Sequence, residues 1–98
     1  MKAFYRREHL SAGQSVQVIC SKPAIVMVMT DAGYEEYQDG QGAGFYGGYF
    51  THFPAIITVP KSGYWNIVID QFSDIAQEMS CSINYLEKAQ ISPDTVEL

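Results

Sequence analysis

The sequence is poor in positive charge. Lysine and arginine together number 6, against 11 aspartates and glutamates in 98 residues, which gives a formal net charge of -5. Its one basic cluster is Lys2, Arg6 and Arg7 near the N-terminus. Nucleic-acid binding depends on clustered basic side chains that displace counterions from phosphates. The composition therefore argues against a nucleic-acid partner, and we expect the basic cluster to lie at a solvated strand edge.

Long apolar runs are also missing. No stretch approaches the roughly 20 apolar residues that a membrane-spanning helix needs. The first ten residues, MKAFYRREHL, lack the continuous apolar segment of a secretory signal. We therefore expect a cytoplasmic protein that has no membrane partner.

Cysteine is scarce as well. Cys20 and Cys81 are too few for a disulfide scaffold, and neither lies in a spacing typical of zinc sites. The run GQGAGF at 40–45 lacks the third glycine and the βαβ surroundings of a dinucleotide site. We expect two free thiols, no metal and no cofactor.

Helical periodicity is rare, whereas short runs of β-branched and aromatic residues are separated by Gly, Pro, Asn or Asp. A chain of 98 residues suits one hydrophobic core. The pattern predicts an all-β fold, a single compact antiparallel β-sandwich (jelly-roll-like) of five to seven strands with little helix. It would span residues 1–86, and residues 87–98 would form a C-terminal tail. The expected strands are 3–10, 15–20, 23–30, 54–60, 64–70 and 81–87.

Two neighbouring expected strands differ in how apolar and polar residues are arranged along them. The strand 15–20 alternates apolar and polar residues, whereas 23–30 is apolar on both faces and therefore reads as a central strand. We expect these two strands to pair with each other. The inward side chains expected from 15–20 and from the last strand are Val16, Val18, Cys20, Cys81, Ile83 and Tyr85.

The centre of the core is expected at 64–70. Trp65, Ile67 and Ile69 alternate onto one face of that strand. We predict that Trp65 packs with Ile57, Ile67 and Ile69 between two sheets. The segment 71–80 is expected to be a connection.

Aromatic residues concentrate at 44–54, GFYGGYFTHFP, after a polar, glycine-rich segment at 31–44 that reads as a long loop. We expect Phe45 or Tyr46, together with Phe53, to enter the core. The remaining rings exceed the needs of one small core and indicate an amphipathic patch for a ligand or partner. The candidate binding residues are Tyr34, Tyr37, Tyr46, Tyr49, Phe50 and His52.

Catalytic signals are weak. His9 and His52 are the side chains whose ordinary pKa lies near neutrality, and no motif surrounds either of them. No serine lies in a G-x-S-x-G turn. The acidic residues at 31–39 lack the spacing of an EF-hand calcium loop, so we expect a solvated segment. No catalytic residue is predicted.

Three segments, HLSAGQSVQV, VMVMTDAGYEEYQDG and FYGGYFTHFPAIITVPKSGYWNIVID, occur in an order that resembles the bacterial family called domain of unknown function 1883. The resemblance runs from about His9 to Leu86 and implies a compact β-sandwich without a known activity. Family members occur alone or, in some bacteria, joined to Toll/interleukin-receptor domains, which implies a sensory or adaptor role in signalling or defence. Its most specific parts are Tyr46-Gly47-Gly48, Pro54, Val59-Pro60, Ser62-Gly63, Trp65 and Val68-Ile69-Asp70.

The leading functional hypothesis is a non-enzymatic binding or interaction module that uses the segment 31–50 to contact a protein or small molecule. Homo-oligomerisation is left open. One alternative is a carbohydrate-binding module, because jelly-roll sandwiches present tyrosines and carboxylates to sugars. A third hypothesis is a small hydrolase that uses His52 with Asp31 or Asp70.

Overall fold

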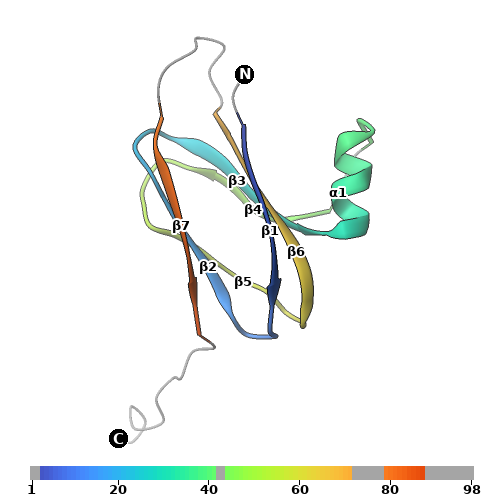
Figure 1. The fold of residues 1–98 in the computed structure, drawn as a ribbon. Helices are drawn as coiled ribbons and strands as arrows, with labels where there is room; N and C mark the ends of the chain where they lie inside the picture. Colours follow the sequence, from blue (N-terminus) through green and yellow to red (C-terminus); the bar gives the residue numbers. More distant parts are fainter. Residues whose placement is uncertain (1–2, 42–43, 72–78, 88–98) are drawn as a thin grey trace, which may run out of the picture.

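The computed structural model describes residues 3–41, 44–71 and 79–87 (Figure 1). Within these residues, seven strands form two antiparallel sheets, which confirms the predicted β-sandwich. The predicted connection falls mostly on residues 72–78 and the predicted tail mostly on residues 88–98, both outside the described residues. The elements are β1 (Ala3–Leu10), β2 (Ser15–Cys20), β3 (Ala24–Thr30), α1 (Asp31–Gln38), β4 (Tyr46–Phe50), β5 (Ala55–Thr58), β6 (Gly63–Gln71) and β7 (Cys81–Leu86).

The four-stranded sheet has the order β1-β6-β3-β4, and the three-stranded sheet has the order β5-β2-β7. The strands β6 and β3 are the two inner strands of the larger sheet, and β2 is the inner strand of the smaller one. Figure 1 shows the two sheets facing each other, while α1 lies against the outer face of the larger sheet. One face of the larger sheet therefore packs against the smaller sheet, and the other face packs against α1.

The core fills the space between the sheets. Trp65 is 2% exposed, and its indole Nε1 donates a hydrogen bond to the backbone carbonyl oxygen of Lys61 at 3.1 Å. The predicted packing of Trp65 with three isoleucines in one cluster is confirmed, as is the inward direction expected for the side chains of β2. The buried members of this cluster on β2, β3, β5 and β6 are Val16, Val18, Cys20, Ala24, Val26, Val28, Ala55, Ile57, Trp65, Ile67 and Ile69.

The predicted pairing of β2 with β3 is wrong. β2 pairs with β5 and β7, whereas β3 pairs with β4 and β6 in the other sheet. The short turn at 21–23 therefore crosses between the sheets instead of closing a hairpin. The physical reason is that β3 is apolar on both faces, so it needs the opposite sheet on one side and a second cover on the other.

The predicted long loop at 31–44 is also wrong over its first half, which forms α1. Thr30 caps the helix, because its Oγ1 accepts a hydrogen bond from the backbone N–H of Gly33 at 3.1 Å. The helix ends before Gly40, whose φ of +80° is a left-handed conformation that favours glycine. Eight residues give a weak periodic signal, and a glycine inside them weakens it further.

The aromatic segment contains the edge strand β4, which is not among the expected strands. Phe45 is 44% exposed and Tyr46 is 47% exposed, so the expectation that one of them enters the core is wrong. Phe53 packs against the core as expected, and Phe50 also packs there. Gly47 has a φ of +124°, and a Cβ atom at this position would lie 2.1 Å from the carbonyl oxygen of Val26.

We expect Trp65→Ala to lower the free energy of unfolding by about 3–5 kcal/mol, because the indole fills the centre of the core. The midpoint of thermal unfolding measures this loss. Tyr64→Ala is the matched control, because the neighbouring ring in the same strand is 50% exposed and its loss should cost less than about 1 kcal/mol. An unchanged midpoint for Trp65→Ala would contradict the core assignment.

We expect Gly47→Ala to destabilise the protein by roughly 1–3 kcal/mol, because the new Cβ atom collides with the β3 backbone and the positive φ disfavours alanine. Urea unfolding measures the change. Gly44→Ala serves as the control, because nothing lies within 4 Å of a Cβ atom there and its φ is not positive. Equal stabilities of the two variants would show that β3 does not constrain Gly47.

Candidate functional site

The outer face of the larger sheet carries side chains in rows that cross the strands. Asp70 of β6 lies opposite Ile25 of β3, and Ile25 lies opposite Tyr49 of β4. Directly opposed residues of antiparallel strands point to the same face of the sheet. These three side chains therefore form one row on the outer face. The next row on this face, two residues further along each strand, contains Tyr5, Val68 and Met27.

The helix α1 adds two tyrosines above these rows. Tyr34 and Tyr37 are three residues apart and therefore lie on the same side of the helix, where both pack against the buried cluster of Met27, Met29 and Val68. The Tyr34 ring stacks on the Tyr5 ring with a centroid distance of 4.7 Å and on the Tyr37 ring with a centroid distance of 6.1 Å. Three rings thus form a continuous stack between the sheet and the helix.

Among the described residues, one carboxylate oxygen on this face has no hydrogen-bond donor. Asp70 is partly buried, and its Oδ1 atom accepts no hydrogen bond from the part of the chain that the structure describes. Burial raises the pKa of the Asp70 carboxyl group. Burial, followed by the nearby Asp70 carboxylate, raises the pKa of Tyr37. A buried acceptor is costly to leave unpaired, so this carboxylate can accept a donor that a bound molecule supplies.

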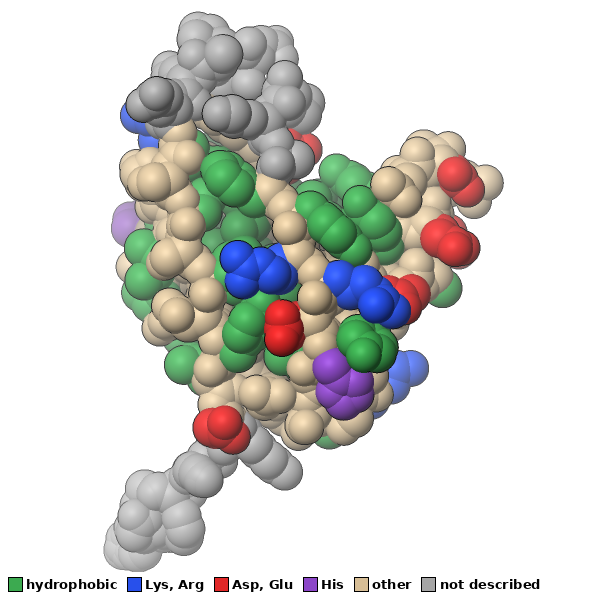
Figure 2. All heavy atoms as spheres, viewed as in Figure 1, with side chains coloured by type: hydrophobic (Ala, Val, Ile, Leu, Met, Phe, Trp, Pro, Cys, Tyr) green, Lys and Arg blue, Asp and Glu red, His purple; other side chains and the backbone are tan. Residues whose placement is uncertain are grey.

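We call these residues the tyrosine face: Tyr5, Tyr34, Tyr37, Tyr49 and Asp70. Tyr5 is 46% exposed and Tyr49 is 55% exposed, while Tyr34, Tyr37 and Asp70 are half-buried. Figure 2 shows hydrophobic side chains between the sheet and α1, with acidic side chains exposed on the helix. The rings are thus anchored by packing and still reach the surface.

A polar network holds the start of α1 against the sheet. Arg7 donates to Asp31 through Nε to Oδ1 at 3.0 Å and through Nη2 to Oδ2 at 2.7 Å. The Nδ2 atom of Asn66, a residue that is 1% exposed, donates to Asp31 Oδ1 at 2.8 Å. The hydroxyl of Tyr5 donates to Asn66 Oδ1 at 2.5 Å. The network therefore positions the Tyr5 ring beneath Tyr34.

The basic cluster that the sequence places near the N-terminus is divided in the fold. Arg7 is paired with Asp31, and its guanidinium carbon lies 4.1 Å from the centroid of the Tyr64 ring. Arg6 is exposed and, one residue away on the strand, points to the opposite face of β1. Lys2 lies outside the described residues.

Six residues were predicted to bind a ligand or partner, and the structure brings three of them together. Tyr34, Tyr37 and Tyr49 lie on the outer face of the larger sheet. Tyr46 and Phe50 alternate onto the opposite face of β4, where the Tyr46 ring meets the Trp65 ring at a centroid distance of 6.0 Å and Phe50 packs against the core.

His52, the sixth candidate, is exposed in the segment between β4 and β5, and its Nδ1 lies 3.0 Å from Thr51 Oγ1. Neither Asp31 nor Asp70 is its hydrogen-bond partner among the described residues. Asp31 instead binds Arg7 and Asn66.

Tyr5 and Asn66 were not among the predicted site residues, and Asp70 was predicted only as a partner for His52. Alternation along β1 carries a usable signal, because Phe4 packs against the core and Tyr5 must then point outward. Thr30 followed by Asp31 is a signal for a helix start. Recognising that start would place Tyr34 and Tyr37 on the same side of a helix.

Within residues 3–41, 44–71 and 79–87, no three His, Cys, Asp or Glu side chains are grouped so that they could hold a metal ion. No helix among the described residues is long and apolar enough to cross a membrane.

The chain belongs to the family described as Domain of unknown function (DUF1883), whose family model matches residues 1–88. The resemblance inferred from the sequence is therefore confirmed. No curated protein and no solved structure matches the chain. The family description assigns no activity, so a functional hypothesis has to be built from the geometry of the tyrosine face.

We expect the Asp31 carboxyl group to titrate well below its ordinary range, because hydrogen bonds from Arg7, then Asn66, lower its pKa from 3.8 to about 2. A pKa that is lower in the folded state stabilises the fold fully above the unfolded pKa of about 3.9. This contribution is lost as the pH falls towards about 2. NMR titration of the carboxyl carbon measures the pKa.

Arg7→Gln should raise the Asp31 pKa towards its ordinary value, because it removes the guanidinium that favours the carboxylate. Arg6→Gln is the control, because Arg6 points to the other face of β1 and should leave the titration unchanged. An Asp31 pKa near 4 in the unmodified protein would show that the ion pair does not form in solution.

Proposed function

We propose that this member of the DUF1883 family is a non-enzymatic binding module whose contact surface is the tyrosine face. The observation that carries the proposal is the stack of Tyr5, Tyr34 and Tyr37 beside a buried oxygen of Asp70 that has no hydrogen-bond partner among the described residues. Rings supply contact area, and the carboxylate supplies a directional acceptor. Aromatic side chains provide much of the energy of known interfaces.

The tyrosine face is also preorganised. Tyr34 and Tyr37 pack against a buried cluster, and Tyr5 is held by Asn66. Side chains that are ordered before binding lose less conformational freedom when a partner arrives. This rigidity supports recognition of a defined chemical group.

Charge favours a positively charged protein segment as the partner. Glu35, Glu36 and Asp39 are exposed on or just after α1, and the chain has a net charge of -5. A lysine or arginine of the partner would pair with Asp70 and lie over a tyrosine ring. Arg7 already adopts this geometry over Tyr64 on the same face of the sheet.

A carbohydrate is the second candidate ligand. Flat tyrosine rings can stack on the apolar faces of sugars, and Asp70 can accept a hydrogen bond from a hydroxyl group. The two candidates differ in their response to salt, because screening weakens binding of a charged segment and hardly changes binding of a neutral sugar.

The cellular role that we propose is a cytoplasmic sensor or adaptor in bacterial signalling or defence. It rests on the resemblance to proteins in which this domain is joined to Toll/interleukin-receptor domains. In that role the tyrosine face would recognise a partner or signal without chemical turnover.

Selection from a displayed random-peptide library tests the proposal directly. We expect the selected peptides to be rich in lysine and arginine, and their affinity to fall as salt rises. Tyr49→Ser combined with Asp70→Asn should weaken the selected peptides by roughly tenfold or more. These positions are preferable to Tyr37, whose ring also packs against the sheet.

Ile56→Ser is the matched control. Ile56 is 52% exposed, close to the 55% of Tyr49, and it lies on the smaller sheet. It should leave peptide affinity unchanged. Peptides that bind the double variant as tightly as the unmodified protein would refute the tyrosine face as the contact surface, and salt-independent capture on a glycan array would favour the carbohydrate.

A further inference from the structure

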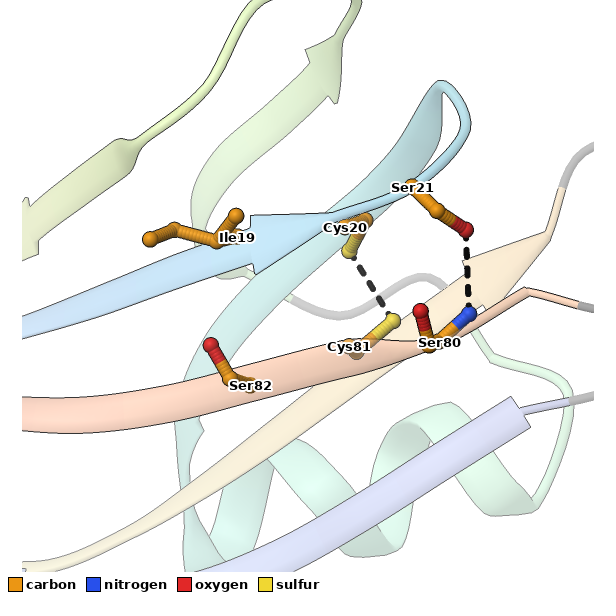
Figure 3. A pocket seen from close by; sticks show the side chains of 6 residues that line it. All are labelled: Ile19, Cys20, Ser21, Ser80, Cys81 and Ser82. Atoms are coloured by element: carbon orange, nitrogen blue, oxygen red, sulfur yellow. Dashed lines mark hydrogen bonds between the residues drawn. The ribbon is translucent and has the colours of Figure 1, made fainter.

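The two cysteines lie directly opposite each other in the smaller sheet. Cys20 is the last residue of β2, Cys81 is the first residue of β7, and the two are register partners (Figure 3). Both thiols are free, and the Sγ atoms are 3.0 Å apart with Cys81 as the donor. Residues 61 positions apart in the sequence are thus placed in contact by strand pairing.

The backbone at this position suits a covalent bridge. Directly opposed residues of antiparallel strands have Cα atoms about 4.5 or 5.5 Å apart, and disulfides join Cα atoms about 4.4–6.8 Å apart. Figure 3 shows the two sulfur atoms pointing toward each other. A disulfide could therefore form here without a change in strand register.

Hydrogen bonds beyond the cysteines hold the two strands in place. The backbone N–H of Ser80 donates to Ser21 Oγ at 3.0 Å, and the backbone N–H of Ser21 donates to the carbonyl oxygen of Ser80 at 2.9 Å. The cysteines are consequently flanked by paired backbone on both sides, so thermal motion does not readily separate them.

The two thiols differ in their exposure to solvent. Cys20 is 7% exposed and belongs to the core cluster, whereas Cys81 is partly exposed. Burial, followed by the hydrogen bond with Cys81, raises the pKa of Cys20 to about 12. A neutral thiol is a poor nucleophile, and Cys81 is the more exposed of the two residues, so Cys81 is the residue that a reagent meets first.

A pocket lies beside the pair. It has a volume of about 290 Å³ and is lined by Ile19, Cys20, Ser21, Ser80, Cys81 and Ser82. A volume of this size accommodates part of a small molecule rather than a protein segment. The serine residues offer hydroxyl groups that can hydrogen-bond a polar reagent.

We propose that Cys20 and Cys81 are a reversible redox modification site, which a low-molecular-weight disulfide oxidises to an intramolecular cross-strand disulfide. The Cys81 thiol loses its proton and attacks one sulfur of the small disulfide, which releases one small thiol and leaves a mixed disulfide on Cys81. Cys20 then loses its proton and attacks the Cys81 sulfur, which releases the second small thiol. Two protein thiols are oxidised and one small disulfide is reduced to two thiols.

The modification would fasten β7, an edge strand, to the inner strand β2. The bridge closes a long loop of chain and restricts the unfolded state. Oxidation should therefore stabilise the domain without altering the tyrosine face, which lies on the other sheet. This inference is independent of the proposed binding function.

Incubation of the folded protein with oxidised glutathione, followed by acid quenching and intact-mass analysis, tests the proposal. The unmodified protein should lose the mass of two hydrogen atoms, form no disulfide-linked dimer and keep no glutathione. Cys20→Ala should instead retain one glutathione on Cys81, and Cys81→Ala should react much more slowly. A stable glutathione adduct or a disulfide-linked dimer of the unmodified protein would overturn the proposal.

Thermal unfolding provides a second measurement. The oxidised protein should unfold about 10 °C or more above the reduced protein, and added dithiothreitol should reverse the shift. Cys81→Ala should show no such shift under the same treatments. Two thiols that are both alkylated when the protein is unfolded after prolonged oxidation would also overturn the proposal.

Discussion

The two inner strands of the larger sheet, β3 and β6, are buried on both faces, and the arrangement of the rest of the chain follows from this constraint. Toward the smaller sheet, Ile67 is fully buried; on the opposite face, Met29 is 1% exposed and Val68 is 3% exposed. Leaving such side chains in water would cost about 1.5–3 kcal/mol each. One sheet face is therefore covered by the second sheet and the other by α1. An isolated helix of eight residues is only marginally stable in water. The helix α1 therefore depends on its packing against the sheet, and the apolar outer face of the sheet depends on α1 to shield it from water.

The same constraint explains why tyrosine suits the positions that cover the sheet. Tyr34 and Tyr37 bury one part of each ring on methionine and valine side chains while the remainder stays accessible. Tyrosine can do both because an apolar ring carries a polar hydroxyl group. Packing and recognition are consequently not exclusive alternatives for these rings. The burial that fixes α1 also holds the rings rigid at the surface.

Local patterns in the sequence predicted six of the seven described strands, and β4 was missed. Alternation assigned Val16 and Val18 to the core, and it assigned Trp65 to the centre of the sandwich. The partner of each strand was not predictable in the same way, because a strand that is apolar on both faces can follow a hairpin or a crossing between sheets equally well. The helix α1 was not predicted for a different reason. Its sequence signal consists only of the N-cap residue Thr30 and two tyrosines three residues apart.

Long-range pairing decides which residues meet in the two proposed sites. Asp70 meets Ile25 and Tyr49 only because β6 and β4 flank β3, and Cys20 meets Cys81 only because β7 completes the smaller sheet. Alternation can place each of these side chains on a face, whereas register decides which of them are neighbours. Each site lies on a different sheet, and the core between them is closely packed. A bridge between β2 and β7 therefore acts on the stability of the domain, while the chemistry of the tyrosine face is set by the outer side of the other sheet.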